Sequence, residues 1–126
     1  MIFDTNIFIY ADRGIERARE VILSATLRSI STVTYMEYVP FCRNKDELAK
    51  FDNLLTALNF NIYEIDNGIS ISARNYVKQF ALSHRVEMAD ALIAATAMKY
   101  DETICTANIR HFTPIKGLSL NRFSHK

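Results

Sequence analysis

The chain has 126 residues, 49% of them hydrophobic, and a formal net charge of +1 at pH 7. This length suits one domain with a substantial core, and the near-neutral charge excludes a globally basic nucleic-acid binder but not a local basic patch. With only 3 Gly and 2 Pro, no segment has the composition of a linker, so we expect a single domain over residues 1–126.

The pattern of apolar residues divides the chain into short strands and amphipathic helices. In chain order, we expect a strand over 1–4, helices over 5–10 and 15–27, a strand over 28–31, helices over 31–42 and 45–58, a strand over 61–65, helices over 67–84 and 87–100, and strands over 103–106 and 118–120. Gly14 ends the first helix, Ser31 or Thr32 caps the third, and Pro40 weakens the end of that third helix.

The alternation of strands and helices predicts an α/β domain with a parallel sheet and right-handed crossovers. Ligands of such sheets collect at the carboxyl ends of the strands. Asp4 stands at the end of the first strand, Glu37 follows the second, and Asn108 follows the fourth. These residues therefore mark the expected site.

Three acids lie in apolar surroundings, far apart in the sequence. Asp90 interrupts the apolar segment 88–98, Asp4 follows three apolar residues, and Glu37 lies among the apolar and hydroxyl residues of 31–39. Burying an unpaired carboxylate costs several kcal/mol, so such a group normally has a partner, a metal or a raised pKa. We therefore predict one shared metal site that the fold assembles from these acids.

The charge is unevenly spread along the chain. From Thr103 onward there are four basic residues and no acid, while the preceding stretch has 11 basic and 14 acidic residues; the four are Arg110, Lys116, Arg122 and Lys126. This stretch is either an ordinary solvated tail or a basic rim beside the acidic pocket.

Four segments together resemble the PIN-domain nucleases, and within them the VapC-type toxins of toxin–antitoxin pairs. They occur in the order and approximate spacing of that family, and they are Ile-Phe-Asp-Thr-Asn-Ile-Phe-Ile-Tyr at 2–10, residues 31–39, Ala-Asp-Ala-Leu-Ile-Ala-Ala-Thr-Ala at 89–97, and Thr-Ala-Asn-Ile-Arg-His-Phe at 106–112. The resemblance covers nearly the whole chain, so it implies a three-layer PIN-like domain with a four- or five-stranded parallel sheet flanked by helices.

The resemblance also implies an activity. It points to an endoribonuclease that uses Mg²⁺ or Mn²⁺ to cleave structured RNA, forms a homodimer and is inhibited by a cognate antitoxin protein. Asp4, Glu37 and Asp90 match the metal-site acids of the family, which are also its catalytic residues. A fourth acid is expected near Asn108 and His111, and its absence leaves open whether one metal or two are bound.

Each site residue has a proposed role and a simpler alternative. Asp4 and Asp90 are expected as metal ligands, or else as helix-capping and helix-dipole charges; Glu37 is expected as a ligand or as the group that orients the attacking water, or else as a half-exposed helical residue. The supporting residues are expected to position the carboxylates, hold a metal-bound water or contact RNA phosphate: Asn6, Thr106, Asn108, Arg110 and His111. The simpler alternative for His111 is a structural or surface role.

Two other functions stay open for the same residues. One is an RNA-processing nuclease that has no antitoxin, and the other is a catalytically silent PIN domain that binds RNA or protein. The apolar segments 35–41 and 51–58 offer either a groove for an antitoxin tail or surfaces that pack in the core or a homodimer. An arginine of that tail is expected to pair with the acidic pocket.

The sequence also gives expectations about compartment. Cys42 and Cys105 lack zinc-site spacing and are expected as reduced thiols. Asp4 interrupts the first apolar residues, which argues against a signal peptide, and the longest apolar stretch is too short to span a membrane. We therefore expect a cytoplasmic protein that does not contact a membrane.

Overall fold

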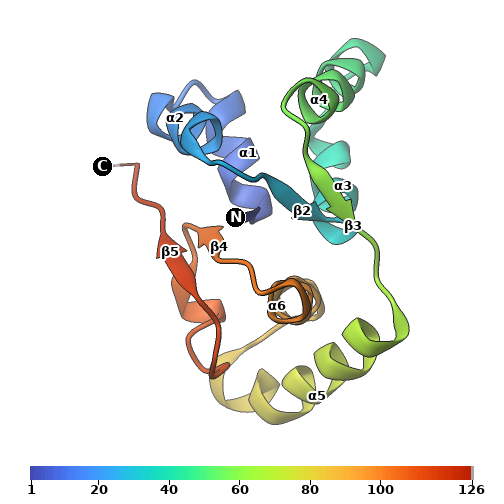
Figure 1. Cartoon of the computed structure of the whole chain (residues 1–126), viewed down its shortest axis with the longest axis vertical. Helices are drawn as coiled ribbons and strands as arrows, with labels where there is room; N and C mark the ends of the chain where they lie inside the picture. Colours follow the sequence, from blue (N-terminus) through green and yellow to red (C-terminus); the bar gives the residue numbers. More distant parts are fainter. Residues whose placement is uncertain (126) are drawn as a thin grey trace.

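The computed structural model describes residues 1–125, which form one five-stranded sheet in the order β3-β2-β1-β4-β5 (Figure 1). All four strand pairings are parallel. The strands are β1 (Ile2–Phe3), β2 (Ser29–Ser31), β3 (Asn61–Tyr63), β4 (Ile104–Thr106) and β5 (Leu120–Arg122). This arrangement confirms the predicted α/β fold with a parallel sheet.

Six helices connect the strands and cover the sheet on both faces. They are α1 (Thr5–Asp12), α2 (Glu16–Ser24), α3 (Thr32–Tyr38), α4 (Lys45–Ala57), α5 (Asn67–His84) and α6 (Met88–Tyr100), with short 3₁₀ turns η1 (Val39–Phe41) and η2 (Ile109–His111). Figure 1 shows α1, α2 and α4 on one side of the sheet and α6 on the other, with α5 packed outside α6.

The two residues of β1 explain how the central strand joins these layers. Successive side chains of a strand point to opposite faces of the sheet. Phe3 packs into the core with Phe8 of α1 and Phe51 of α4, whereas Ile2 packs into the core with Ile93 of α6. Both β1 side chains are fully buried, so the strand needs only two residues to anchor the sheet.

The last strand differs from the prediction. It begins at Leu120 and ends at Arg122, instead of spanning 118–120, because Leu120 pairs with Ile104 and Arg122 pairs with Thr106. This register places Arg122 beside the carboxyl end of β4. The alternation in the sequence did not determine it, because pairing with β4 selects the residues that form the strand.

The remaining boundaries follow the local sequence closely. The Ser31 side chain caps α3, and Pro40 lies in η1, where the third helix tightens and ends. Cys105 is buried in β4, and both cysteines are free thiols. Within residues 1–125, no helix combines the length and apolar character needed to cross a membrane.

Candidate active site

Asp4 occupies the junction between β1 and α1, where its carboxylate is held by both neighbouring segments. Its Oδ1 accepts a hydrogen bond from the Thr5 backbone N–H at 2.8 Å, which caps α1. Its Oδ2 accepts a 2.7 Å hydrogen bond from Thr106 Oγ1 and a 3.4 Å one from Asn6 Nδ2. Only 7% of the residue is exposed, so these contacts fix the direction of the carboxylate.

The turn after β4 is attached to the same place. Thr106 Oγ1 accepts a hydrogen bond from the backbone N–H of Asn108 at 2.9 Å while it donates to Asp4. The Ala107 N–H donates to Asn6 Oδ1 at 3.3 Å. Asn6 and Thr106 thus both donate to Asp4, whereas Asn108 takes part through its backbone and its side chain is exposed.

Glu37 joins the site through Thr5, the residue that follows Asp4. It lies on α3, and its Oε1 accepts a 2.6 Å hydrogen bond from Thr5 Oγ1. Thr5 therefore contacts Asp4 through its backbone and Glu37 through its side chain. The position of Thr5 directly after Asp4 was the available signal, but only the packing of α3 against α1 reveals the link to Glu37.

Asp90 approaches from the other layer of the molecule. It lies in the first turn of α6, and 15% of its side chain is exposed. Its Oδ2 accepts a 3.4 Å hydrogen bond from the Glu87 backbone N–H, as the capping alternative expects. His111 Nδ1 lies 3.4 Å from the same oxygen, so the imidazole at the end of η2 contacts the acidic site.

The pKa values of Asp4 and Asp90 show that nearby cations do not compensate the negative charge of these carboxylates. Burial raises the pKa of Asp4 above its ordinary value, against hydrogen bonds from Thr106 and Thr5, and the Asp90 charge raises it further. Burial likewise raises the pKa of Asp90, while His111 and the Glu87 N–H act in the opposite direction. A cation placed between these carboxylates would offset both effects.

The donor atoms of this site suit a hard cation. Within residues 1–125, no group of three or more His, Cys, Asp or Glu side chains is gathered as a ready metal centre. Mg²⁺ commonly uses only one or two protein carboxylates and completes its octahedron with water and substrate phosphates. Asp4 and Asp90 fit that mode, and Glu37 stays next to them through Thr5.

The Arg110 side chain is exposed on η2, next to His111. Both residues line a pocket that adjoins the acids, because His111 also contacts Asp90. Lys116 does not line this pocket, and Lys126 lies outside the described residues. The basic stretch is thus divided: two of its four cations, Arg110 and Arg122, share one surface.

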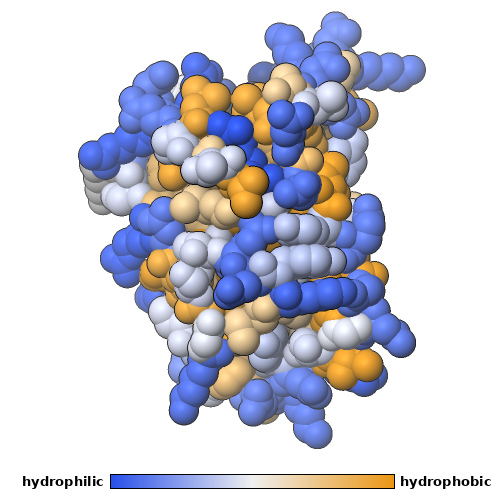
Figure 2. All heavy atoms as spheres, in the orientation of Figure 1, coloured by the Kyte–Doolittle hydropathy of each residue, from blue (hydrophilic) through white to orange (hydrophobic). Residues whose placement is uncertain are grey.

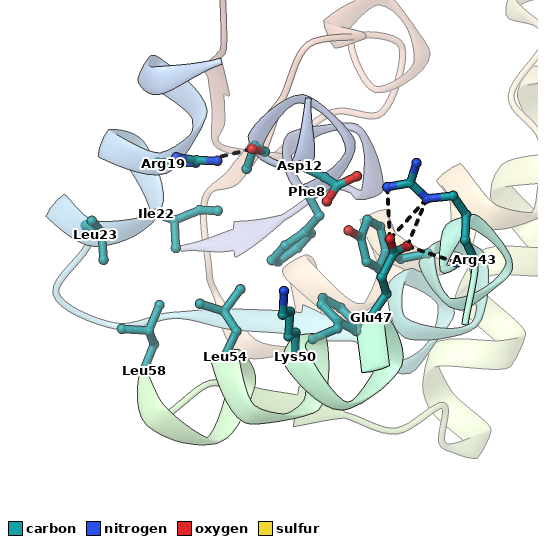
Figure 3. A pocket seen from close by; sticks show the side chains of 13 residues that line it. Phe8, Asp12, Arg19, Ile22, Leu23, Arg43, Glu47, Lys50, Leu54 and Leu58 are labelled. Carbon is teal, nitrogen blue, oxygen red and sulfur yellow. Dashed lines mark hydrogen bonds and ion pairs between the residues drawn. The ribbon is translucent and has the colours of Figure 1, made fainter. Parts of the chain in front are cut away.

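A second feature is a largely apolar groove between α1, α2 and α4, with a volume of about 540 Å³ (Figure 3). Charged side chains also line it: Asp12, Arg19, Arg43, Glu47 and Lys50. Its floor includes Phe8 and Phe51, and Leu23 and Leu54 lie along its exposed sides. Figure 2 shows hydrophobic side chains gathered on the surface between α2 and α4. Of the two apolar segments noted in the sequence, 51–58 lines most of the α4 side and 35–41 contributes Tyr38.

Comparison with known proteins places this arrangement in context. The family described as PIN domain matches residues 1–116, and no curated protein sequence gives a significant match. Solved structures with a similar fold include a toxin–antitoxin complex from Klebsiella pneumoniae, with 24% identity, a TM-score of 0.74, and coverage of 99% of this chain and 97% of that chain.

Two further structures are similar over almost their whole length. DNA-bound VapBC from Salmonella typhimurium has 22% identity and a TM-score of 0.78, covering 96% of both chains. FitAcB from Neisseria gonorrhoeae has 23% identity and a TM-score of 0.73, covering 98% of this chain and 96% of that chain. At these identities the likenesses establish a shared fold.

Proposed function

The chain belongs to the PIN domain family, and from that premise we propose that it is a Mg²⁺- or Mn²⁺-dependent endoribonuclease and the toxin of a toxin–antitoxin pair. The observation that supports the proposal is that the charges of Asp4 and Asp90 interact in a largely buried site, while Thr5 links Asp4 to Glu37. A silent binding domain would not need Asp4 and Asp90, whose charged forms are disfavoured by burial.

In the proposed mechanism, Asp4 and Asp90 would hold the divalent cation. When bound, the cation supplies positive charge against the phosphate and acidifies water. Thr106 and the Thr5 N–H keep the Asp4 carboxylate, which is 7% exposed, in one orientation. The site is therefore organised before RNA arrives.

Glu37 is suited to act on the attacking water. It is exposed, and its Oε1 is fixed by Thr5 Oγ1 at 2.6 Å, which leaves its other oxygen available to accept a proton. As the water oxygen bonds to phosphorus, Glu37 takes the proton, the P–O bond to one ribose oxygen breaks, and solvent protonates the leaving oxygen. His111 faces the same space and would contact the phosphate.

The antitoxin part of the proposal draws on the neighbours and on the groove. The similar structures include toxin–antitoxin complexes, and this chain carries an apolar groove that a helical tail would fill. An arginine of the partner would pair with the Asp4 and Asp90 carboxylates, which offer acceptor oxygens for a guanidinium. Such a partner would block both the cation and RNA.

We also propose a homodimer. Met36, Ile71 and Met88 are large apolar side chains that remain exposed and do not line the groove. Burying such side chains against a second copy would be favourable. Light scattering of the purified protein tests this point: twice the 14.5 kDa chain mass is expected, and a monomer at all concentrations would contradict it.

The function itself is tested with purified protein and total RNA, with and without Mg²⁺ or Mn²⁺, followed by mapping of the cleaved ends. Asp4→Asn and Asp90→Asn should abolish cleavage and weaken cation binding, while circular dichroism shows a folded protein. Glu20→Gln, on the exposed surface of α2, is the matched control and should cleave normally. Cation-independent cleavage, or unchanged cation affinity in both Asp variants, would refute the proposal.

A further inference from the structure

A second pocket of about 400 Å³ lies beside the acidic site, on the side of the C-terminal segment. It is formed where the end of α1 meets η2 and the residues that follow β5. The side chains that define its character are Tyr10, Arg110, His111, Arg122, Phe123 and His125. These residues come from segments far apart in the sequence.

The charge of this pocket is entirely basic. Arg110 and Arg122 are both exposed, and within residues 1–125 neither guanidinium has a hydrogen-bond or ion-pair partner. No Asp or Glu is among the lining residues. Two unpaired guanidinium groups on one concave surface form an anion site suited to phosphate, because each offers several donors in a fixed plane.

Aromatic rings lie next to these cations. The Tyr10 ring stacks with the His125 imidazole at 4.8 Å between centroids and 27° between planes, and Phe123 packs beside Tyr10 at 5.8 Å. Phe123 is buried and holds Tyr10 in place, whereas His125 is exposed. The cluster therefore presents a supported aromatic surface to solvent.

The pocket is continuous with the acidic site. His111 lines the pocket and also contacts Asp90 through Nδ1 at 3.4 Å. Arg122 pairs in register with Thr106, whose hydroxyl donates to Asp4. A polyanion lying across the acids would thus reach both arginines without leaving the surface.

We propose that this pocket binds one nucleotide of single-stranded RNA next to the phosphate that is cleaved. Arg110 and Arg122 contact its phosphate, and its base stacks on the Tyr10–His125 rings. The carboxylates of an acidic peptide could pair with the arginines, but they could not stack on the aromatic rings. A nucleotide can do both, so the pocket favours RNA. The proposal rests on the proposed nuclease function, because it places the acids at the reacting phosphate.

The phosphate contact is tested in the Asp90→Asn background, where binding is measured without cleavage. The probe is a fluorescently labelled single-stranded oligoribonucleotide, titrated at several salt concentrations. Arg122→Gln should lower affinity severalfold and reduce the slope of log affinity against log salt by about 0.7, the value for one phosphate contact on a single strand. Lys78→Gln, an exposed cation on α5, should leave both quantities unchanged.

The stacking contact is tested at His125, which is exposed and whose replacement should not disturb the fold. His125→Ala should weaken binding about fivefold or more, and His125→Phe should restore it, because base stacking needs a ring rather than an imidazole. An oligoribonucleotide that carries an abasic residue at the affected position should bind the His125→Ala variant and its parent equally.

The results separate failure of this proposal from failure of the nuclease assignment. Unchanged affinity and salt slope in Arg122→Gln would overturn the nucleotide pocket, even if the parent protein cleaves RNA. Binding of an acidic peptide in place of RNA would also overturn it. If the protein with intact Asp90 fails to cleave RNA with either cation, the nuclease proposal fails, and the pocket is then judged by the binding results alone.

Discussion

At the residue scale, Thr5 and Thr106 account for the geometry of the acidic site. Thr106 Oγ1 donates a hydrogen bond to one carboxylate oxygen of Asp4, and the Thr5 N–H donates to the other. Thr5 Oγ1 donates to Glu37. Hydroxyl donors bring carboxylates near one another without adding a positive charge that would compete with a bound cation. The acids are thus oriented while their charge remains available.

The raised pKa values of Asp4 and Asp90 predict that protons compete with the cation. Mn²⁺ affinity should rise with pH through the titration of these carboxyls, and binding should release protons. Calorimetry in two buffers with different ionisation enthalpies measures that release. Asp90→Asn should lower the affinity about tenfold or more and release fewer protons. Equal proton release by the parent and the variant would contradict the assignment.

The same pKa shifts predict a stability effect in cation-free protein. An acid whose pKa is raised in the folded state binds more protons when folded than when unfolded, so it lowers stability as pH rises above the unfolded value of about 4. Asp90→Asn should therefore raise the melting temperature in EDTA at pH 7, and the gain should vanish at pH 3. Glu20→Gln is the control, and thermal unfolding is the measurement.

At the element scale, α4 shows how one helix serves the core and the groove. Its Phe51 and Leu55 side chains are buried, with exposed fractions of 5% and 4%. Leu54, on the neighbouring face, lines the groove and has an exposed fraction of 39%. Adjacent positions on a helix point about 100° apart, so a one-residue step changes the surface a side chain faces. The helix therefore contributes to the groove through Leu54 while Phe51 and Leu55 stay buried in the core.

This arrangement predicts that Leu54→Lys weakens antitoxin binding without unfolding the protein. Lysine at this position would place a charge against the apolar face of the docked tail, so a loss of at least about fivefold in affinity is expected. Isothermal titration with a candidate small protein encoded next to this gene measures it. Leu82→Lys, at a fully exposed apolar residue on α5, is the matched control. Equal losses in both variants would exclude the groove as the docking site.

At the scale of the whole molecule, Glu102 connects several strands of the sheet, on the side away from the acidic site. Its carboxylate accepts hydrogen bonds from Ser29 Oγ at 3.0 Å, from the Met1 amino group at 3.0 Å and from the Tyr63 hydroxyl. These partners belong to or adjoin β2, β1 and β3. Burial alone raises the pKa of Glu102, but these hydrogen bonds outweigh it and lower the pKa.

Glu102→Gln should therefore lower the free energy of unfolding by about 1–3 kcal/mol at pH 7. This is the usual cost when a buried hydrogen-bonding group loses its partner. Because the folded pKa is lowered, this stabilisation is present above the unfolded value and is lost as pH falls through the folded value. Urea unfolding at pH 7 and pH 3 measures the difference. Glu64→Gln, at an exposed acid, should change little.

The local sequence alone determined most of the elements of this protein. The spacing of apolar residues, the caps at Asp4 and Ser31 and the break at Pro40 act over a few residues, so helices and strands were predictable within short errors. The apolar settings of Asp4 and Asp90 also indicated a buried acidic site, because charge in such segments needs compensation.

Only the tertiary structure decided which residues meet. The last strand is Leu120–Arg122 rather than the expected 118–120, because its pairing with β4 selects the register. In that register Arg122 lies opposite Thr106, next to the site. Thr5 reaches Glu37 only through the packing of α3 on α1, and Tyr10 meets His125 from opposite ends of the chain. Such contacts depend on long-range packing, which periodicity does not encode, because it reports only the face that each element buries.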